Sequence, residues 1–311
     1  MMVNVLQNSS TMYDVIIAGG GPAGLSAALM LGRCRRRVLV CDLQQPRNAR
    51  SRALHGYLTR DGIAPRELLA IGRRELEQYH TVEFRMAEVA DAQWCKDEKA
   101  FDVKLASGER FASRKLLLAT GVADNLPEVP GIHELYGRSV FHCPYCDGWE
   151  LRDQPIAIYG TGERGTGLAL ELTVWSRDLV LCTNGPCDLP DDERARLERN
   201  GIGVREEPID RLEGQDGILQ NIIFQTGERL PRRAMFFTEG QFQQSHLCTT
   251  LGCEFNDKGT VRTGKYETTH LPGLFVCGDA SRRVQWVVVA AAEGAEAAFA
   301  INTDLLKEDL R

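Results

Sequence analysis

A strand, a glycine-rich turn, a helix and a second strand follow one another twice along this chain of 311 residues. In the first copy, an apolar run at 13–18 leads into Gly19-Gly20-Gly21-Pro22-Ala23-Gly24. Small residues that favour a helix come next, and a second apolar run, 37–41, ends at Asp42. Glycines at this spacing let the backbone approach a pyrophosphate, and an acid at the end of the second strand suits a ribose hydroxyl group. The pattern predicts a dinucleotide-binding β-α-β unit.

The second copy starts at 155–159, and its turn is Gly160-Thr161-Gly162-Glu163-Arg164-Gly165, before a helix at 168–175 and a strand at 178–182. That strand ends in Cys182-Thr183-Asn184. The acid that holds a 2′-hydroxyl group and the arginine that holds a 2′-phosphate are both missing there. Two interpretations stay open: a working pyridine-nucleotide site, or a relic with weak binding or none.

Each copy continues with a meander and then a buried strand. The runs 82–86, 89–94 and 101–105 predict a small antiparallel meander, and 115–119 and 234–238 are the buried strands. A last strand, 274–277, ends in Gly278-Asp279 before an Ala-rich helix that begins near Gln285. The sequence therefore predicts an α/β fold of two Rossmann-like, three-layer (ββα) nucleotide-binding domains, the second inserted into the first. The predicted bounds are 1–122 with 247–311 for the first domain, and 123–246 for the second.

A pair of cysteines carries the reactive chemistry. His142-Cys143-Pro144-Tyr145-Cys146-Asp147-Gly148 places two thiols at Cys-x-x-Cys spacing with a carboxylate directly after the second. Such a pair closes a local disulfide, in which one thiolate attacks a partner and the other resolves the mixed disulfide. Asp147 is placed to exchange a proton with a sulfur atom. The sequence predicts a redox-active disulfide.

Composition excludes several classes of function. Lys+Arg 37 against Asp+Glu 43 gives 37 − 43 = −6, so no basic footprint for nucleic acid is present. Cys182/Cys187 and Cys248/Cys253 have four-residue gaps but no zinc-ligand pattern, so we expect no metal site. The first dozen residues predict no signal peptide, and the longest apolar run is broken by Glu293 and Glu296. We expect a cytoplasmic protein with no membrane span.

In the order and spacing of its motifs, the chain resembles the low-molecular-weight thioredoxin reductase family of FAD-dependent disulfide oxidoreductases over nearly its whole length. In chain order, these motifs are Gly19–Gly24, Ala119-Thr120-Gly121, Cys143-x-x-Cys146-Asp147-Gly148, the second glycine turn, and Gly278-Asp279 with Gln285. The resemblance implies that 1–122 with 247–311 binds FAD and that 123–246 is a redox-disulfide and NAD(P)-binding-like domain. A homodimer is implied as well.

The resemblance also assigns roles to residues. Cys146 would lie next to the isoalloxazine ring, and Cys143 would be the outward thiol that attacks the substrate disulfide. Asp147 would donate and accept the proton. Asp279 would bind the ribityl chain, and the start of the Gln285 helix would face the pyrimidine end of the flavin, where helix N–H groups stabilise negative charge.

Three departures point to a diverged branch of the family. The paired basic residues that grip the NADPH 2′-phosphate are missing, Asp42 is followed by Leu43-Gln44-Gln45-Pro46-Arg47-Asn48 and not by the Gly-Gly-Gln segment, and the loop before Gln285 is short. That branch includes dithiol oxidases of the gliotoxin and holomycin type, and some members of the family take electrons from ferredoxin.

Several side chains near these motifs have two interpretations each. His55 either assists proton transfer or hydrogen-bonds in a loop beside the flavin edge, and His142 either lowers the pKa of the Cys143 thiol or caps a turn. Trp286 either stacks near the flavin or packs. Arg47 and Asn48 either reach the pyrophosphate or lie in solvent.

The sequence thus predicts an FAD enzyme that passes two electrons between flavin and the Cys143–Cys146 pair. A thioredoxin-like protein or a small disulfide is the expected partner, with NADPH, NADH or ferredoxin open as the electron donor. One alternative is a small-molecule dithiol oxidase that uses oxygen, and another is a flavin redox sensor without turnover.

Overall fold

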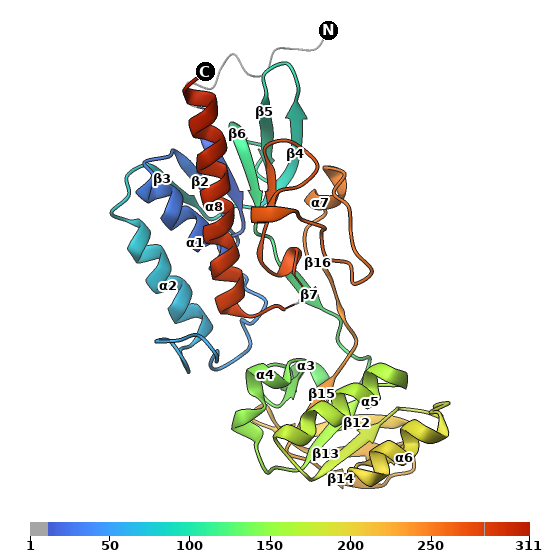
Figure 1. Cartoon of the computed structure of the whole chain (residues 1–311). Helices are drawn as coiled ribbons and strands as arrows, with labels where there is room; N and C mark the ends of the chain where they lie inside the picture. Colours follow the sequence, from blue (N-terminus) through green and yellow to red (C-terminus); the bar gives the residue numbers. More distant parts are fainter. Residues whose placement is uncertain (1–11, 283) are drawn as a thin grey trace. The chain divides into compact units, whose positions relative to one another are not determined.

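The computed structural model describes residues 12–282 and 284–311, and the chain divides into two compact units (Figure 1). The first unit contains the described residues up to 49, together with 65–123 and 241–311. The second unit contains 50–64 and 124–240. Residues 50–64 fall inside the range 1–122, but their contacts group them with the second unit.

The first unit is built on a seven-stranded sheet in the order β3-β2-β1-β6-β5-β4, with β17 paired to β6. The strands are β1 Tyr13–Ala18, β2 Val38–Cys41, β3 Val82–Arg85, β4 Val89–Cys95, β5 Ala100–Leu105, β6 Arg110–Leu118 and β17 Leu274–Val276. Strands β3, β2, β1, β6 and β17 are parallel, whereas β4, β5 and the start of β6 form an antiparallel meander. The parallel part positions the glycine turn at the carboxyl ends of its strands.

The prediction that 82–86 belongs to the meander is wrong. Strand β3 pairs in parallel with β2, with Val82 opposite Val38. The helix α2, Pro65–Leu76, lies between these two strands in the chain. A strand that returns to its sheet through a helix runs parallel to the strand it left, because the crossover carries the chain back to the same edge.

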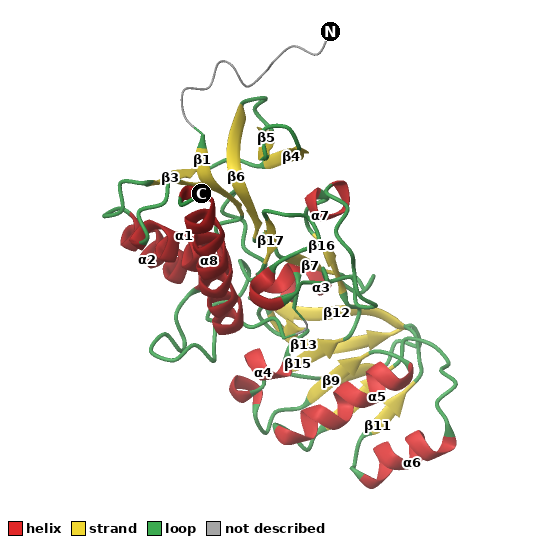
Figure 2. Cartoon of the chain, turned by 45° about the horizontal axis from the view of Figure 1, so that its top comes forward, coloured by secondary structure: helices red, strands yellow, loops and turns green. Residues whose placement is uncertain are grey.

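Helices cover one face of this sheet, and loops with a short helix cover the other. The helices α1 (Pro22–Arg33), α2 and α8 (Val287–Asp309) share one apolar core with the parallel strands (Figure 2). Helix α8 packs on α1 so closely that a Cβ atom at Gly294 would lie 2.0 Å from the carbonyl oxygen of Ala23. The short helix α7 (Leu247–Thr250) shares the core of the opposite face with β4 and β5.

The second unit repeats the layered plan. Its parallel sheet has the order β11-β10-β9-β15-β8, made of β8 Val140–Phe141, β9 Ile156–Tyr159, β10 Leu179–Cys182, β11 Gly203–Arg205 and β15 Ala234–Phe237. The helices α5 (Gly162–Glu171) and α6 (Asp191–Arg199) cover one face. An antiparallel sheet of β12 (Ile209–Gln215), β13 (Ile218–Phe224) and β14 (Arg229–Pro231) covers the other, with α3 (Ile132–Leu135).

The helix of this unit begins at Gly162 and not at the expected 168. The chain turns directly from β9 into α5, and the first turn of α5 packs closely on the end of β9. A Cβ atom at Gly165 would lie 2.7 Å from the carbonyl carbon of Gly160, so this close packing requires glycine. One short α-helix, α4 (Pro144–Asp147), and two short strands, β7 (Val122–Asp124) and β16 (Gln241–Gln243), complete the described α-helices and strands, and β7 pairs with β16. The α/β fold with two nucleotide-binding-type sheets is confirmed. Within 12–282 and 284–311, none of the helices has the length and apolar character that crossing a bilayer requires.

Candidate flavin and disulfide sites

The glycine turn of the first unit is closed tightly against the ends of its strands. Gly19 donates its N–H group to the carbonyl oxygen of Cys41 at 2.8 Å and has a φ of +106°. A Cβ atom at Gly19 would lie 2.2 Å from the carbonyl oxygen of Ala119, and one at Gly24 would lie 1.9 Å from that of Gly19. Only glycine fits at these two positions, as the sequence pattern requires.

The same turn leaves room for a ligand. A Cβ atom at Gly21 would meet nothing within 4 Å, and this residue precedes the first turn of α1, whose N–H groups suit an anion. The Thr120 hydroxyl oxygen is buried without a hydrogen-bond partner among the described residues. Asp42 lies beside the turn, since a Cβ atom at Gly20 would lie 2.9 Å from the Cβ atom of Asp42. These features fit the dinucleotide part of FAD.

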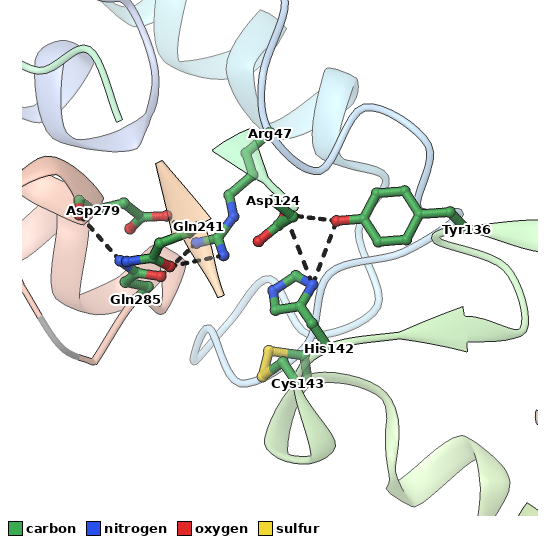
Figure 3. The surroundings of a disulfide bond; sticks show 9 residues. Arg47, Asp124, Tyr136, His142, Cys143, Gln241, Asp279 and Gln285 are labelled. Atoms are coloured by element: carbon green, nitrogen blue, oxygen red, sulfur yellow. Dashed lines mark hydrogen bonds and ion pairs between the residues drawn. A yellow bond between two sulfur atoms is a disulfide. The ribbon is translucent and has the colours of Figure 1, made fainter. Parts of the chain in front are cut away.

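The other end of the expected flavin site is held by an arginine. The guanidinium group of Arg47 donates to Asp279 at 2.9 Å and to Gln285 at 2.7 Å (Figure 3). The Gln285 amide in turn donates to the carbonyl oxygen of Asp279 at 3.1 Å. Behind them, Glu293 accepts the N–H group of Gly278 at 2.8 Å. The structure therefore brings together two residues expected at the flavin, Asp279 and Gln285, through Arg47.

The remaining expected flavin residues are placed as follows. Gly121 has a φ of +66°, Asn48 lies half-buried in the turn after β2, and Trp286 precedes the first residue of α8 and is 39% exposed. His55 belongs to the second unit, where its Nδ1 lies 3.5 Å from Asp61 and its Nε2 lies 3.6 Å from Glu150. These contacts pair His55 with carboxylates.

Cys143 and Cys146 form a disulfide at the start of α4 (Figure 3). Cys143 occupies the N-cap position with an extended backbone, and Pro144 begins the helix, where its fixed φ is favourable. The turn is closed by hydrogen bonds from Cys146 N–H to the Cys143 carbonyl oxygen at 3.1 Å and from Gly148 N–H to that of Pro144 at 2.7 Å. Both cysteines thus lie within one helical turn.

Asp147 is held in a state that suits proton exchange. Burial, with the nearby charge of Glu150 as a second cause, raises the pKa of its carboxyl group to about 7. A carboxylic acid with this pKa both gives and takes a proton near neutral pH. The chemistry expected for Asp147 from its position after Cys146 therefore agrees with its surroundings.

His142 lies in a group of three side chains that the sequence did not indicate. Tyr136 donates its hydroxyl group to Asp124 at 2.6 Å, the Tyr136 oxygen lies 3.4 Å from Nδ1 of His142, and that nitrogen lies 3.8 Å from Asp124. Figure 3 shows Tyr136 and His142 both turned toward Asp124, whose side chain is 4% exposed. The imidazole next to Cys143 is thus oriented by a buried carboxylate.

The strand end of the second unit is occupied by structural contacts. Asn184 accepts the N–H group of Ile209 at 2.7 Å and donates to the Tyr159 hydroxyl group at 3.3 Å. On the elements that follow, Arg194 pairs with Glu206 at 2.8 Å, and Arg205 pairs with Glu207 at 3.0 Å and Glu228 at 2.7 Å. Each of these arginines faces a carboxylate, which leaves little positive charge for a 2′-phosphate.

Comparisons with known proteins agree with this geometry. A family model described as pyridine nucleotide-disulphide oxidoreductase matches residues 13–294. A probable thioredoxin reductase of Arthroderma benhamiae is 31% identical over 301 residues, which cover 86% of this chain and 74% of that protein. The solved structure of HlmI is 37% identical with a TM-score of 0.92, covering 97% of this chain and 95% of the other. The solved structure of a putative thioredoxin reductase of Bacillus anthracis is 34% identical with a TM-score of 0.90, covering 96% of this chain and 99% of the other.

Proposed function

This chain belongs to the pyridine nucleotide-disulphide oxidoreductase family, and on that premise we propose that it oxidises a small dithiol through Cys143 and Cys146 without using NADPH. It is a flavin-dependent disulfide oxidoreductase of the thioredoxin reductase type, and its cofactor is FAD. The observation that carries the proposal is the pairing of Arg194 and Arg205 with carboxylates beside the strand end that follows the second glycine turn.

The thiol chemistry takes two steps at the disulfide. A thiolate of the dithiol attacks Cys143, which breaks the Cys143–Cys146 bond and releases Cys146 as a thiolate. The second thiol of the substrate then attacks the mixed disulfide and releases Cys143. The substrate leaves as a disulfide, and both enzyme cysteines are reduced. FAD, when bound, would supply the two-electron redox chemistry that links the reduced pair to oxygen as the final acceptor, with hydrogen peroxide as the product.

Two side chains handle the protons. His142 is oriented by Asp124 and Tyr136, and it takes the proton from the attacking thiol next to Cys143. Asp147 follows Cys146 and, with a pKa raised to about 7, exchanges a proton with that sulfur. The glycine turn, Thr120 and Asp42 would hold the dinucleotide part of FAD, and Asp279 with Gln285, joined by Arg47, would hold its flavin end.

A second candidate is the reductase direction, in which electrons pass from flavin to a thioredoxin-like protein or a small disulfide. The order Cys143-x-x-Cys146-Asp147-Gly148 favours it, and several relatives carry the name thioredoxin reductase. NADPH, NADH or ferredoxin would then be the donor. The homodimer and the cytoplasmic location stay predictions.

Anaerobic titration of the purified flavoprotein with NADPH, NADH and dithiothreitol in parallel separates the two directions. We expect dithiothreitol to bleach the flavin absorbance at about one equivalent per FAD and both nucleotides to leave it unchanged. Re-admission of air should restore the colour and consume oxygen. Bleaching by NADPH would overturn the proposal in favour of the reductase.

A further inference from the structure

The end of α7 brings two cysteines side by side. Cys253 donates its backbone N–H group to the carbonyl oxygen of Cys248 at 2.8 Å, and Gly252 donates to that of Thr249 at 3.0 Å. Gly252 has a φ of +71°. This is a Schellman motif, in which a left-handed glycine ends the helix and the residue after it returns to the last turn. In that motif the side chains of the two end residues meet, and here both are thiols.

The two sulfur atoms interact in an apolar environment. Cys248 is fully buried and Cys253 is 7% exposed, and both pack in the core of the first unit with Val261 and Ala280. The neighbouring Cys248 thiol lowers the pKa of Cys253 against the effect of burial, whereas the Cys253 thiol and then burial raise the pKa of Cys248. Cys253 is therefore both the more acidic and the more exposed member.

We propose that Cys248 and Cys253 form a second redox pair, which hydroperoxides oxidise to an intramolecular disulfide. The Cys253 thiolate attacks the peroxide and becomes a sulfenic acid, with loss of water or alcohol. Cys248 then attacks that sulfur, the S–S bond forms, and the sulfenic acid oxygen leaves as one water. Two thiols and one hydroperoxide thus give one disulfide, and the backbone hydrogen bond between the two residues holds them within the reach that a disulfide requires.

The position of the pair links it to the expected flavin site within the same unit. The segment after Cys253 forms a bridge between Phe255 and Val261, and Val261 donates its N–H group to the carbonyl oxygen of Ala280 at 2.8 Å. Ala280 follows Asp279. Oxidation of the pair would therefore fasten α7 to the segment that supports the Gly278–Ala280 turn, and it would shield both sulfur atoms from further oxidation.

Peptide mapping of the intact flavoprotein tests this proposal. The protein is treated with increasing hydrogen peroxide, unfolded in alkylating reagent without reductant, and digested with trypsin. One tryptic peptide, 234–258, contains Cys248 and Cys253 and no other cysteine. We expect this peptide to lose two hydrogen atoms and to carry no alkyl group, and we expect dithiothreitol added before alkylation to restore two alkyl groups.

The same digest contains a matched control. Peptide 178–194 holds Cys182 and Cys187 with the same four-residue gap, but the sulfur of Cys187 hydrogen-bonds Glu206 at 3.4 Å. We expect this peptide to keep two alkyl groups. Equal alkylation of both peptides at every peroxide level, or oxidation of single sulfur atoms in 234–258, would overturn the proposal. Because peroxide is added directly, the outcome does not depend on the direction of electron flow at Cys143 and Cys146.

Discussion

The hydroxyl group of Tyr136 donates a 2.6 Å hydrogen bond to the buried carboxylate of Asp124. The same carboxylate faces Nδ1 of His142, the residue before Cys143. A carboxylate on Nδ1 favours the tautomer that carries its proton there, which leaves Nε2 as the proton acceptor of the ring. The group therefore orients one basic nitrogen next to a reactive cysteine.

Replacement of His142 by Gln tests this orientation. We expect the rate of dithiol-driven flavin reduction at neutral pH to fall by about 10²-fold, because the thiol loses its general base. The rate should fall by nearly as much in Asp124→Asn. It should fall less in Tyr136→Phe, because that variant keeps the Asp124 carboxylate. Stopped-flow absorbance checks this order, and added imidazole should partly rescue His142→Gly. Equal rates for wild type and His142→Gln would show that His142 only caps the turn.

The raised pKa of Asp147 predicts a pH dependence with a defined sign. Below pH 7 the carboxyl group holds its proton and cannot accept another, so dithiol oxidation should speed up as the pH rises through about 7. Asp147→Asn should remove this rise. Glu150→Gln removes the like charge and should move the rise to lower pH, whereas Glu198→Gln, on the exposed face of α6, should leave it in place. If the rate of Asp147→Asn rose with pH in the same way as the wild-type rate, Asp147 would not be the proton acceptor.

Two glycines of the first turn form a matched pair. Gly24→Ala would place a Cβ atom 1.9 Å from the Gly19 carbonyl oxygen, and we expect it to lower the free energy of unfolding by about 1–3 kcal/mol and to abolish FAD binding. Gly21→Ala meets nothing within 4 Å and has a φ of −72°, so the fold should be kept. FAD binding should still be lost, because the methyl group occupies the backbone approach to the pyrophosphate. Full FAD occupancy in purified Gly21→Ala would contradict this placement.

Arg47 donates hydrogen bonds of 2.9 and 2.7 Å to Asp279 and Gln285, which lie 232 and 238 residues further along the chain. We expect Arg47→Gln to weaken FAD binding by about 10- to 100-fold, the effect of losing hydrogen bonds to a charged group. Arg47→Lys keeps the charge without the planar fork and should lie between. Fluorescence titration of the apoprotein measures the affinity. Arg110→Gln, which breaks an ion pair with Asp102 on the meander, serves as the control.

The parts of the site that are formed by residues adjacent in the sequence were predictable from the sequence. The glycine turn and the Cys143–Cys146 disulfide each depend on a few consecutive residues, and the structure forms both. The parallel pairing of β3 was not predictable from its own residues, because it depends on the helix before it. The sequence around Asp124 did not indicate a role for this residue either, because the role depends on Tyr136 and His142, which lie near Asp124 only in the folded chain. The flavin-binding roles expected for the site residues, Asp42, Asn48, His55, Asp279 and Trp286 among them, all stay predictions.

Anaerobic mixing of a small dithiol with FAD-loaded wild type, Cys143→Ser and Cys146→Ser isolates electron transfer through the Cys143–Cys146 pair, because only the flavin absorbance is followed and no later step contributes. We predict rapid bleaching in the wild type and none in either variant, because electrons reach the flavin only through an intact pair at Cys143 and Cys146. Bleaching of both variants at the wild-type rate would contradict the account.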